Sequence, residues 1–187
     1  MIKDWIKFNE SKNYGDLYHS IWRSSMTQNQ ILNILSGVLE NGLKFSKNVF
    51  TSSPSSINKN FLFLGDNYFL STTRNKQVIN KYPVTFVLDG GSISNKYKIE
   101  PFNLKAPREI GISKTDRKNL EYLKSLKPGE EYKEFNGRYF AEEKIVSNKE
   151  GYLNTKYIKE IILNKPSDEL IEFINQLDTK GIKITII

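Results

Sequence analysis

Three short stretches of the chain carry side chains that could do chemistry. The single histidine, His19, lies in the run LYHSIW, residues 71–73 (STT) are three successive hydroxyl groups after an aromatic run, and Glu142 and Glu143 are adjacent in FAEEKIV. Hydroxyl groups can hydrogen-bond a ribose or orient a neighbouring carboxylate, and a carboxylate can stabilise developing positive charge. A histidine can exchange a proton near neutral pH.

Each stretch also has an ordinary structural interpretation. A strand histidine can bond only to backbone, and hydroxyl groups at a strand end are often turn or cap groups. Side chains alternate along a strand, so Glu142 and Glu143 point to opposite faces, and at least one can face the interior or a cleft. The ordinary interpretation is an edge strand with one glutamate in solvent and the other paired with Lys144 or Arg138. The residues alone leave both interpretations open.

Composition limits the kind of site and the kind of partner. The chain has no cysteine and one histidine, which excludes disulfides, thiolate nucleophiles and metal sites built from several Cys or His ligands. The glycine-rich phosphate loops, the zinc-protease motif and the nucleophile elbow are absent from the sequence. A formal net charge of +7 attracts anions such as nucleic acid, a nucleotide or an acidic protein. The lysines are scattered among glutamates, however, which is also typical of a solvated surface.

The length of 187 residues favours one domain over residues 1–187, with a core that needs neither disulfides nor metal. No apolar run approaches the length of a membrane-spanning helix, and the first nine residues are unlike a signal peptide. We therefore expect a soluble, cytoplasmic protein without membrane contact. Its oligomeric state is open.

The elements expected around these stretches indicate an α+β fold. Helical spacing over residues 30–40, with Thr27 and Gln30 as a capping box and Gly42 as the end, predicts an amphipathic helix. Two more helices are expected, over residues 115–126 and from the cap Ser167 to Gly181. The strand-like runs are residues 16–22, 67–73, 84–88, 96–99, 139–147, 157–163 and 182–186.

Two connections are predicted from turn residues. Residues 89–91 (DGG) are a turn signal, so residues 84–88 and 96–99 are expected to form a hairpin. Residues 51–60 are rich in Ser, Asn and Pro and are expected to form an exposed loop within the domain. Short strands with few helices, outside a strict βαβ order, are typical of an α+β domain.

The order of these stretches resembles the ADP-ribosyltransferase fold, and in detail a group of transferase-like proteins of tailed bacteriophages. The resemblance spans residues 16–163 and rests on LYHSIW, a helix ending in ENGL, YFLSTTR, VTFVLDGGSISNKYKIEPF, FAEEKIV and YIKEIIL. It implies a split mixed or antiparallel β-sheet around a central NAD cleft, with flanking helices. It also implies transfer of ADP-ribose from NAD, as co-substrate, to an acceptor in the host cytoplasm, without metal.

The resemblance assigns catalytic roles by position. The His or Arg of the family's first core strand falls on His19, within a Y-H-[GS] pattern, and its S-T-S motif falls on Ser71-Thr72-Thr73. Its glutamate falls on Glu142 or Glu143, and an E-[ED]-[RK]-[IVL] pattern favours Glu142. Cleavage of the nicotinamide–ribose bond builds positive charge at the anomeric carbon, which this carboxylate would stabilise while Ser71 orients it.

The remaining assignments concern binding. His19 would hold NAD through the adenosine-side ribose or the diphosphate, and Tyr68 or Tyr18 would stack on nicotinamide. The other groups assigned to NAD are the hydroxyls of Ser20, Thr72 and Thr73 and, for the diphosphate, the guanidinium groups of Arg23 and Arg74. Residues 134–139 (EFNGRY) occupy the place of the family's acceptor-recognition loop.

The acceptor and the activity itself remain open at this point. Arginine-modifying members commonly carry a Glu or Gln two residues before the catalytic glutamate, where this chain has Phe140, or Ala141 if Glu143 is catalytic. This departure argues against arginine as the acceptor, and the acceptor expected from the resemblance is a host protein or a nucleic acid. One alternative is a nucleic-acid-binding module that uses the lysines and aromatics of residues 93–108. Another is a phage interaction protein that keeps the fold without activity.

Overall fold

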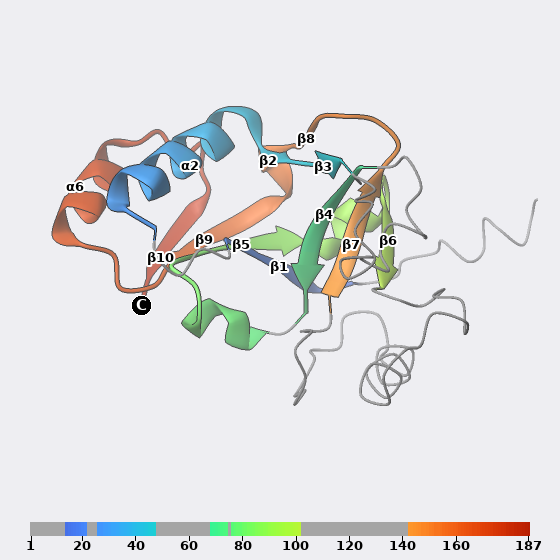
Figure 1. Ribbon diagram of the computed structural model, residues 1–187, viewed down its shortest axis with the longest axis horizontal. Helices are drawn as coiled ribbons and strands as arrows, with labels where there is room; N and C mark the ends of the chain where they lie inside the picture. Colours follow the sequence, from blue (N-terminus) through green and yellow to red (C-terminus); the bar gives the residue numbers. More distant parts are fainter. Residues whose placement is uncertain (1–13, 22–25, 48–67, 75, 102–141) are drawn as a thin grey trace, which may run out of the picture.

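In the part of the chain that the structure describes, a mostly antiparallel sheet of eight strands is flanked by a few helices (Figure 1). The computed structural model describes residues 14–21, 26–47, 68–74, 76–101 and 142–187. The predicted α+β class is confirmed. The strand order is β10-β9-β5-β1-β4-β7-β6, with β3 added beside β4, and among the described strands only β10 and β9 pair in parallel. The sheet strands are β1 (Asp16–Ser20), β3 (Ser46–Lys47), β4 (Tyr68–Thr73), β5 (Val84–Asp89), β6 (Lys98–Pro101), β7 (Glu142–Ser147), β9 (Ile158–Leu163) and β10 (Lys183–Ile186).

The first long helix forms as its local sequence predicts. In α2 (Gln28–Asn41), Thr27 is the N-cap and Gln30 completes the capping box, so backbone donors at the helix start are bonded reciprocally. Gly42 ends the helix with a φ of 94°, a conformation that favours glycine, and a Cβ at this position would collide with the Leu153 carbonyl oxygen. Leu153 belongs to β8 (Tyr152–Leu153), which pairs with β2 (Leu43–Lys44) as a separate two-stranded sheet.

The second helix, α6 (Asp168–Gln176), begins at the predicted N-cap Ser167 but ends at Leu177, before Gly181. Gly181 instead has a φ of 78° in the turn that leads into β10. Because a left-handed glycine suits a tight turn as well as a helix end, the prediction of the helix end at this residue was wrong.

The predicted hairpin between residues 84–88 and 96–99 is also wrong. Asp89 caps a short helix, α4 (Gly90–Ser94), and its side chain accepts from the Ser92 backbone N–H. An aspartate before two glycines is a good helix N-cap as well as a turn former, and here capping prevails. Strand β5 pairs with β1 and β9, whereas β6 pairs with β7.

The sheet has two parts that differ in direction and composition. Strand β1 pairs with β5 along its length, from Asp16↔Asp89 to Ser20↔Thr85, but with β4 only at Tyr18↔Thr73. Figure 1 shows β4 and β7 running steeply across the direction of β5 and β9. We call β5, β9 and β10 the apolar strands and β4 and β7 the polar strand pair.

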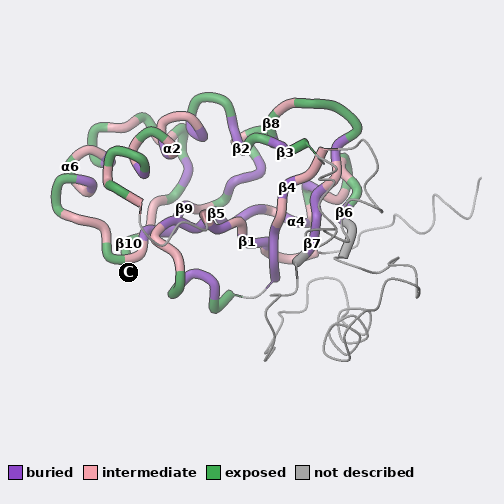
Figure 2. Tube along the Cα trace, in the orientation of Figure 1, coloured by how far each residue is buried: buried purple, intermediate pink, exposed green. Residues whose placement is uncertain are grey.

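The main core lies between the sheet and the helices α2 and α6. Figure 2 shows β1, β5 and β9 largely buried and much of both helices exposed or half-buried. The core is mainly aliphatic, with the aromatic rings of Phe45, Phe86 and Tyr157 among its buried members. Its fully buried members on the apolar strands are Val84, Phe86, Leu88, Ile161 and Leu163. A smaller cluster on the opposite face of the sheet surrounds Tyr18 and includes residues of a 3-10 turn, η2 (Lys76–Asn80).

Several sequence predictions fall outside the described residues. These are the helix over residues 115–126, the loop over residues 51–60, the acceptor-recognition loop over residues 134–139, Arg23 and Arg138. Within the described ranges, no helix is long and apolar enough to cross a membrane.

Candidate functional site on β1, β4 and β7

The three chemically interesting stretches lie on neighbouring strands. Strand β4 stands between β1 and β7, and its register with β7 runs from Tyr68↔Ser147 to Thr73↔Glu142. The hydroxyl run therefore faces the glutamate pair directly, with Thr72 opposite Glu143. From β1, the His19 Nδ1 atom lies 2.7 Å from the Ser71 carbonyl oxygen. Segments more than 50 residues apart in the chain thus meet at one place.

Most of the buried polar and charged residues of the described ranges belong to the polar strand pair or follow it directly. They are Thr72, Thr73, Arg74, Glu143, Lys144 and Ser147. The other two, Ser20 and Thr85, bond to each other through their hydroxyls at 2.8 Å across β1 and β5. Burying charged groups costs free energy even when they are paired. Such a concentration of buried charge is typical of a functional site rather than of a structural core.

The strongest interaction in this cluster is a buried ion pair. The Arg74 guanidinium lies 2.8 Å from Glu143 Oε1, and the two side chains are 8% and 2% exposed. The other carboxylate oxygen, Oε2, is buried and has no hydrogen-bond partner among the described residues. Burial raises the pKa of the Glu143 carboxyl, and Arg74 opposes that rise. The Tyr14 ring lies 5.3 Å from the Arg74 guanidinium carbon and covers it.

His19 is held in one tautomer. A carbonyl oxygen only accepts, so the Nδ1 atom donates to Ser71, and in the neutral ring Nε2 carries the free lone pair. The ring stacks on Phe86 with centroids 6.2 Å apart. Burial lowers the pKa of His19, and the hydrogen bond to Ser71 opposes this change. The imidazole is therefore neutral at pH 7 and presents an acceptor.

His19, Thr72 and Glu143 share one face of the sheet. Each stands two residues from a main-core residue on its own strand, and side chains two apart point the same way. Those core residues are Leu17, Leu70 and Ile145. Thr72 also links the strands, since its hydroxyl donates to the Glu143 carbonyl oxygen at 2.9 Å. An imidazole acceptor, a hydroxyl and a carboxylate thus form a row across three strands.

The opposite face of the polar strand pair carries a different contact. The Lys144 ammonium donates to the Ser71 hydroxyl at 2.7 Å and lies 4.2 Å from the Phe69 ring centroid. The register places Glu100 of β6 opposite Lys144. Ser71, which the resemblance assigns to orienting a glutamate, therefore contacts a cation. Glu142 pairs with Thr73 through the backbone register of the two strands.

The ordinary interpretation of the glutamate pair is wrong in two respects. Strand β7 is not an edge strand, because it lies between β4 and β6. The buried glutamate, Glu143, pairs with Arg74 rather than with Lys144. The sequence offered no signal for Arg74 as the partner or for Tyr14 above it, because both contacts depend on which strands become neighbours.

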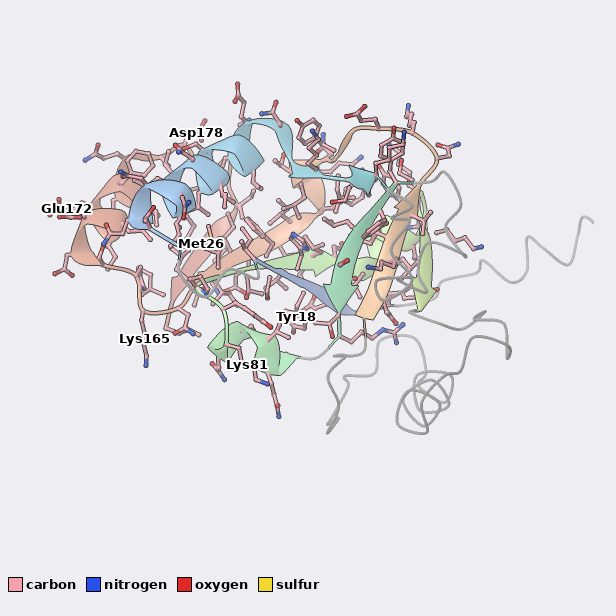
Figure 3. The ribbon with its side chains drawn as sticks, in the orientation of Figure 1. Tyr18, Met26, Lys81, Lys165, Glu172 and Asp178 are labelled. Carbon is pink, nitrogen blue, oxygen red and sulfur yellow. The ribbon has the colours of Figure 1, made fainter. Side chains whose placement is uncertain are left out.

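The remaining residues assigned to NAD lie in several places. Tyr18 is 4% exposed and clusters with Val78 and Val87, on the side of the sheet that η2 covers (Figure 3). Its neighbour His19 alternates to the other face. Tyr68 is partly buried against the main core, and Ser20 is bonded to Thr85. The structure thus brings together His19, Thr72, Arg74 and Glu143 on one face, whereas the side chains of Tyr18, Ser20, Ser71 and Thr73 alternate to the other.

The described residues were compared with known kinds of metal site, and the chain with known proteins. Among the described residues, no group of three or more His, Asp or Glu side chains is arranged to hold a metal ion. A search of family models, curated proteins and solved structures found no match to this chain.

Proposed function

We propose that this protein cleaves NAD and transfers ADP-ribose to a host macromolecule, with Glu143 as the catalytic carboxylate. The proposal combines the sequence resemblance to ADP-ribosyltransferases with one observation. The strands that the resemblance assigns to the site are neighbours, and they carry His19, Thr72 and Glu143 on one face. Strands β1 and β4 pair at the single residue pair Tyr18↔Thr73, where the strand direction changes. This limited pairing supports the split sheet that the resemblance implies.

The groups present suit the chemistry of this reaction. As the bond between the anomeric carbon and the nicotinamide nitrogen breaks, its electron pair leaves with nicotinamide and the ribose becomes an oxocarbenium ion. A fixed carboxylate beside that carbon stabilises the charge, more strongly in a buried site than in water. Arg74 holds one oxygen of Glu143, which leaves Oε2 to accept from a ribose hydroxyl. The acceptor then attacks the anomeric carbon and loses its proton.

The choice of Glu143 over Glu142 differs from the sequence-based preference. Glu143 is buried, is oriented by an ion pair and shares a face with His19 and Thr72. Glu142 pairs with Thr73 in the strand register. Because side chains alternate along a strand, Thr73 lies on the face opposite the row of His19, Thr72 and Glu143. The alternation supports Glu143.

Nicotinamide release from labelled NAD tests the proposal. The wild type is expected to release nicotinamide, and Glu143→Gln is expected to lose about 100-fold or more of that rate, since a positioned charge of this kind typically contributes that much. Glu142→Gln is the matched control and should keep most of the rate. Each variant is checked for a native circular dichroism spectrum. No release by folded wild type, or equal rates for wild type and Glu143→Gln, would contradict the proposal.

A second candidate is a non-catalytic nucleic-acid-binding or phage interaction protein that retains the fold. The contact between Lys144 and Ser71 favours it, because the hydroxyl that the resemblance assigns to orienting the glutamate is instead bonded to a cation on the opposite face. This candidate predicts that the wild type binds its partner without releasing nicotinamide, and that Glu143→Gln leaves the binding unchanged.

A further inference from the structure

One end of the sheet carries a group of exposed lysines that the proposed chemistry does not use. Lys47 of β3 is opposite Tyr68 of β4, which is opposite Ser147 of β7. The residue before Ser147, Val146, is opposite Lys98 of β6. Lys47 and Lys98 therefore lie at the same end of four adjacent strands, where both are exposed, and because side chains alternate along a strand they project from opposite faces of that end. Three strand spacings separate β3 from β6, a width of about 14 Å.

The loop after β7 adds a third lysine. The Ser147 hydroxyl donates to the Lys149 carbonyl oxygen at 2.8 Å and accepts from its backbone N–H at 3.3 Å. These two bonds hold the loop at the same end of the sheet, and Lys149 is exposed. Its ammonium group therefore projects from an ordered segment of backbone.

The two-stranded sheet next to this loop adds a lysine and an aromatic ring. Lys44 and Tyr152 are directly opposite each other on β2 and β8, and both are exposed, whereas their neighbours Leu43 and Leu153 are buried. Tyr152 is 46% exposed, an unusual position for a large ring. Cross-strand partners have Cβ atoms about 5 Å apart, so the cation and the ring are side by side. We call Lys44, Lys47, Lys98, Lys149 and Tyr152 the lysine rim.

The far end of the molecule exposes acids and lysines in nearly equal numbers, whereas lysines prevail at the rim. Helix α6 and the residues after it expose four carboxylates, although lysines lie nearby: Asp168, Glu169, Glu172 and Asp178. At the rim, Glu150 is the exposed acid among residues 43–47 and 147–153. Figure 3 places Glu172 at the opposite end of the molecule from β3 and β6. A polyanion is therefore attracted to the rim end.

We infer that the lysine rim binds single-stranded nucleic acid, with the lysines contacting phosphates and Tyr152 stacking on a base. Lysines spread over about 14 Å can contact successive phosphates of one strand. An exposed ring adds affinity for unpaired bases, which offer a free face, whereas the bases of a duplex are already stacked. An acidic protein would use the charge but not the ring. The inference deepens the proposed function, on which it rests, by naming nucleic acid as the class of the acceptor.

Fluorescence anisotropy with a labelled RNA of about 12 nucleotides tests the inference. The rim variant is Lys44→Glu/Lys47→Glu/Lys149→Glu, and the matched control is Lys81→Glu/Lys165→Glu/Lys180→Glu. The control changes net charge equally at exposed lysines, two of which Figure 3 labels away from the rim. We expect the rim variant to lose at least about tenfold in affinity and to flatten the salt dependence, while the control stays within about twofold. Tyr152→Ala should weaken binding about tenfold.

Two results would overturn the inference. One is an equal loss in the rim and control variants, which would mean that net charge alone attracts the RNA. The other is binding of a duplex or a poly-glutamate peptide as tight as that of the single strand. The assay is run without NAD, and also with Glu143→Gln, so the rim is tested even if nicotinamide release fails. Conversely, nicotinamide release without RNA binding would overturn the rim and leave the proposed function standing.

Discussion

The apolar strands and the polar strand pair belong to one sheet but are built on different principles. On β5 and β9, residues such as Phe86, Ile161 and Leu163 are fully buried among other apolar groups, which stabilises the fold. On β4 and β7, comparable depth is occupied by Glu143 and Lys144, whose burial costs free energy. The difference teaches that the apolar strands hold the fold, whereas the polar strand pair buries charge at the expense of stability, as the chemistry that we propose for it would require.

Breaking the buried ion pair gives the largest expected effect on stability. Arg74→Met leaves Glu143 as an uncompensated buried carboxylate, so the free energy of unfolding should fall by about 3–5 kcal/mol in urea denaturation. The double variant Arg74→Met/Glu143→Leu replaces the pair with apolar groups and should recover most of that loss or exceed the wild type. It should nevertheless release no nicotinamide. A double variant as unstable as Arg74→Met would mean that the pair stabilises the fold, contrary to the comparison.

A cavity in the apolar strands should affect stability without affecting chemistry. Leu163→Ala removes a fully buried side chain of the main core, and unfolding should become easier by about 2–5 kcal/mol. Ile186→Ala, at a position that is 48% exposed, is the control and should change stability by less than about 0.5 kcal/mol. The nicotinamide release rate per folded molecule should be unchanged in both variants. A selective loss of that rate in Leu163→Ala would show that the two parts of the sheet are not separate in role.

The smallest expected effect is a pH dependence from His19. Because burial lowers its pKa in the folded state, the unfolded chain takes up the proton first as the pH falls. Stability from the neutral ring is thus present above about pH 6.5 and lost below it, with a slope of at most about 1.4 kcal/mol per pH unit. His19→Asn keeps a donor near Nδ1 but does not titrate there.

The difference in unfolding free energy between wild type and His19→Asn isolates this effect from Glu143, which is present in both. Glu143 has its pKa raised by burial, so its own contribution runs the other way and is lost as the pH rises. Urea midpoints measured from about pH 8 to about pH 5 should show the wild type falling relative to the variant. Parallel curves would mean that His19 is solvated and belongs to no buried site.

The features that depend on local sequence were predictable, and those that depend on strand partners were not. The capping box of Thr27 and Gln30 is a four-residue signal, and α2 begins where it predicts. The turn signal at Asp89 failed because the same residues can cap a helix, and the choice between them is made by packing against β1. Strand pairing joins distant segments, which composition does not encode.

The candidate site was also predictable only where it depends on local sequence and not on strand partners. The residue types at His19, the hydroxyl run and the glutamate pair were identified from the sequence, and their meeting was an expectation from the resemblance. Which glutamate lies with His19 depends on the register of β4 with β7, and a shift of one residue would exchange Glu142 and Glu143 between faces. The Arg74 partner of Glu143 follows from that register as well.

The central claim is that the polar strand pair and β1, rather than the apolar strands, receive NAD. Titration of the isotope-labelled protein with NAD, followed by NMR amide shifts, tests it most directly. We predict that amides around His19, Thr72 and Glu143 shift with a common binding curve, while those of Ile161, Leu163 and Thr185 stay in place. Shifts centred on β9 and β10, or no saturable shifts in the folded protein, would contradict the account.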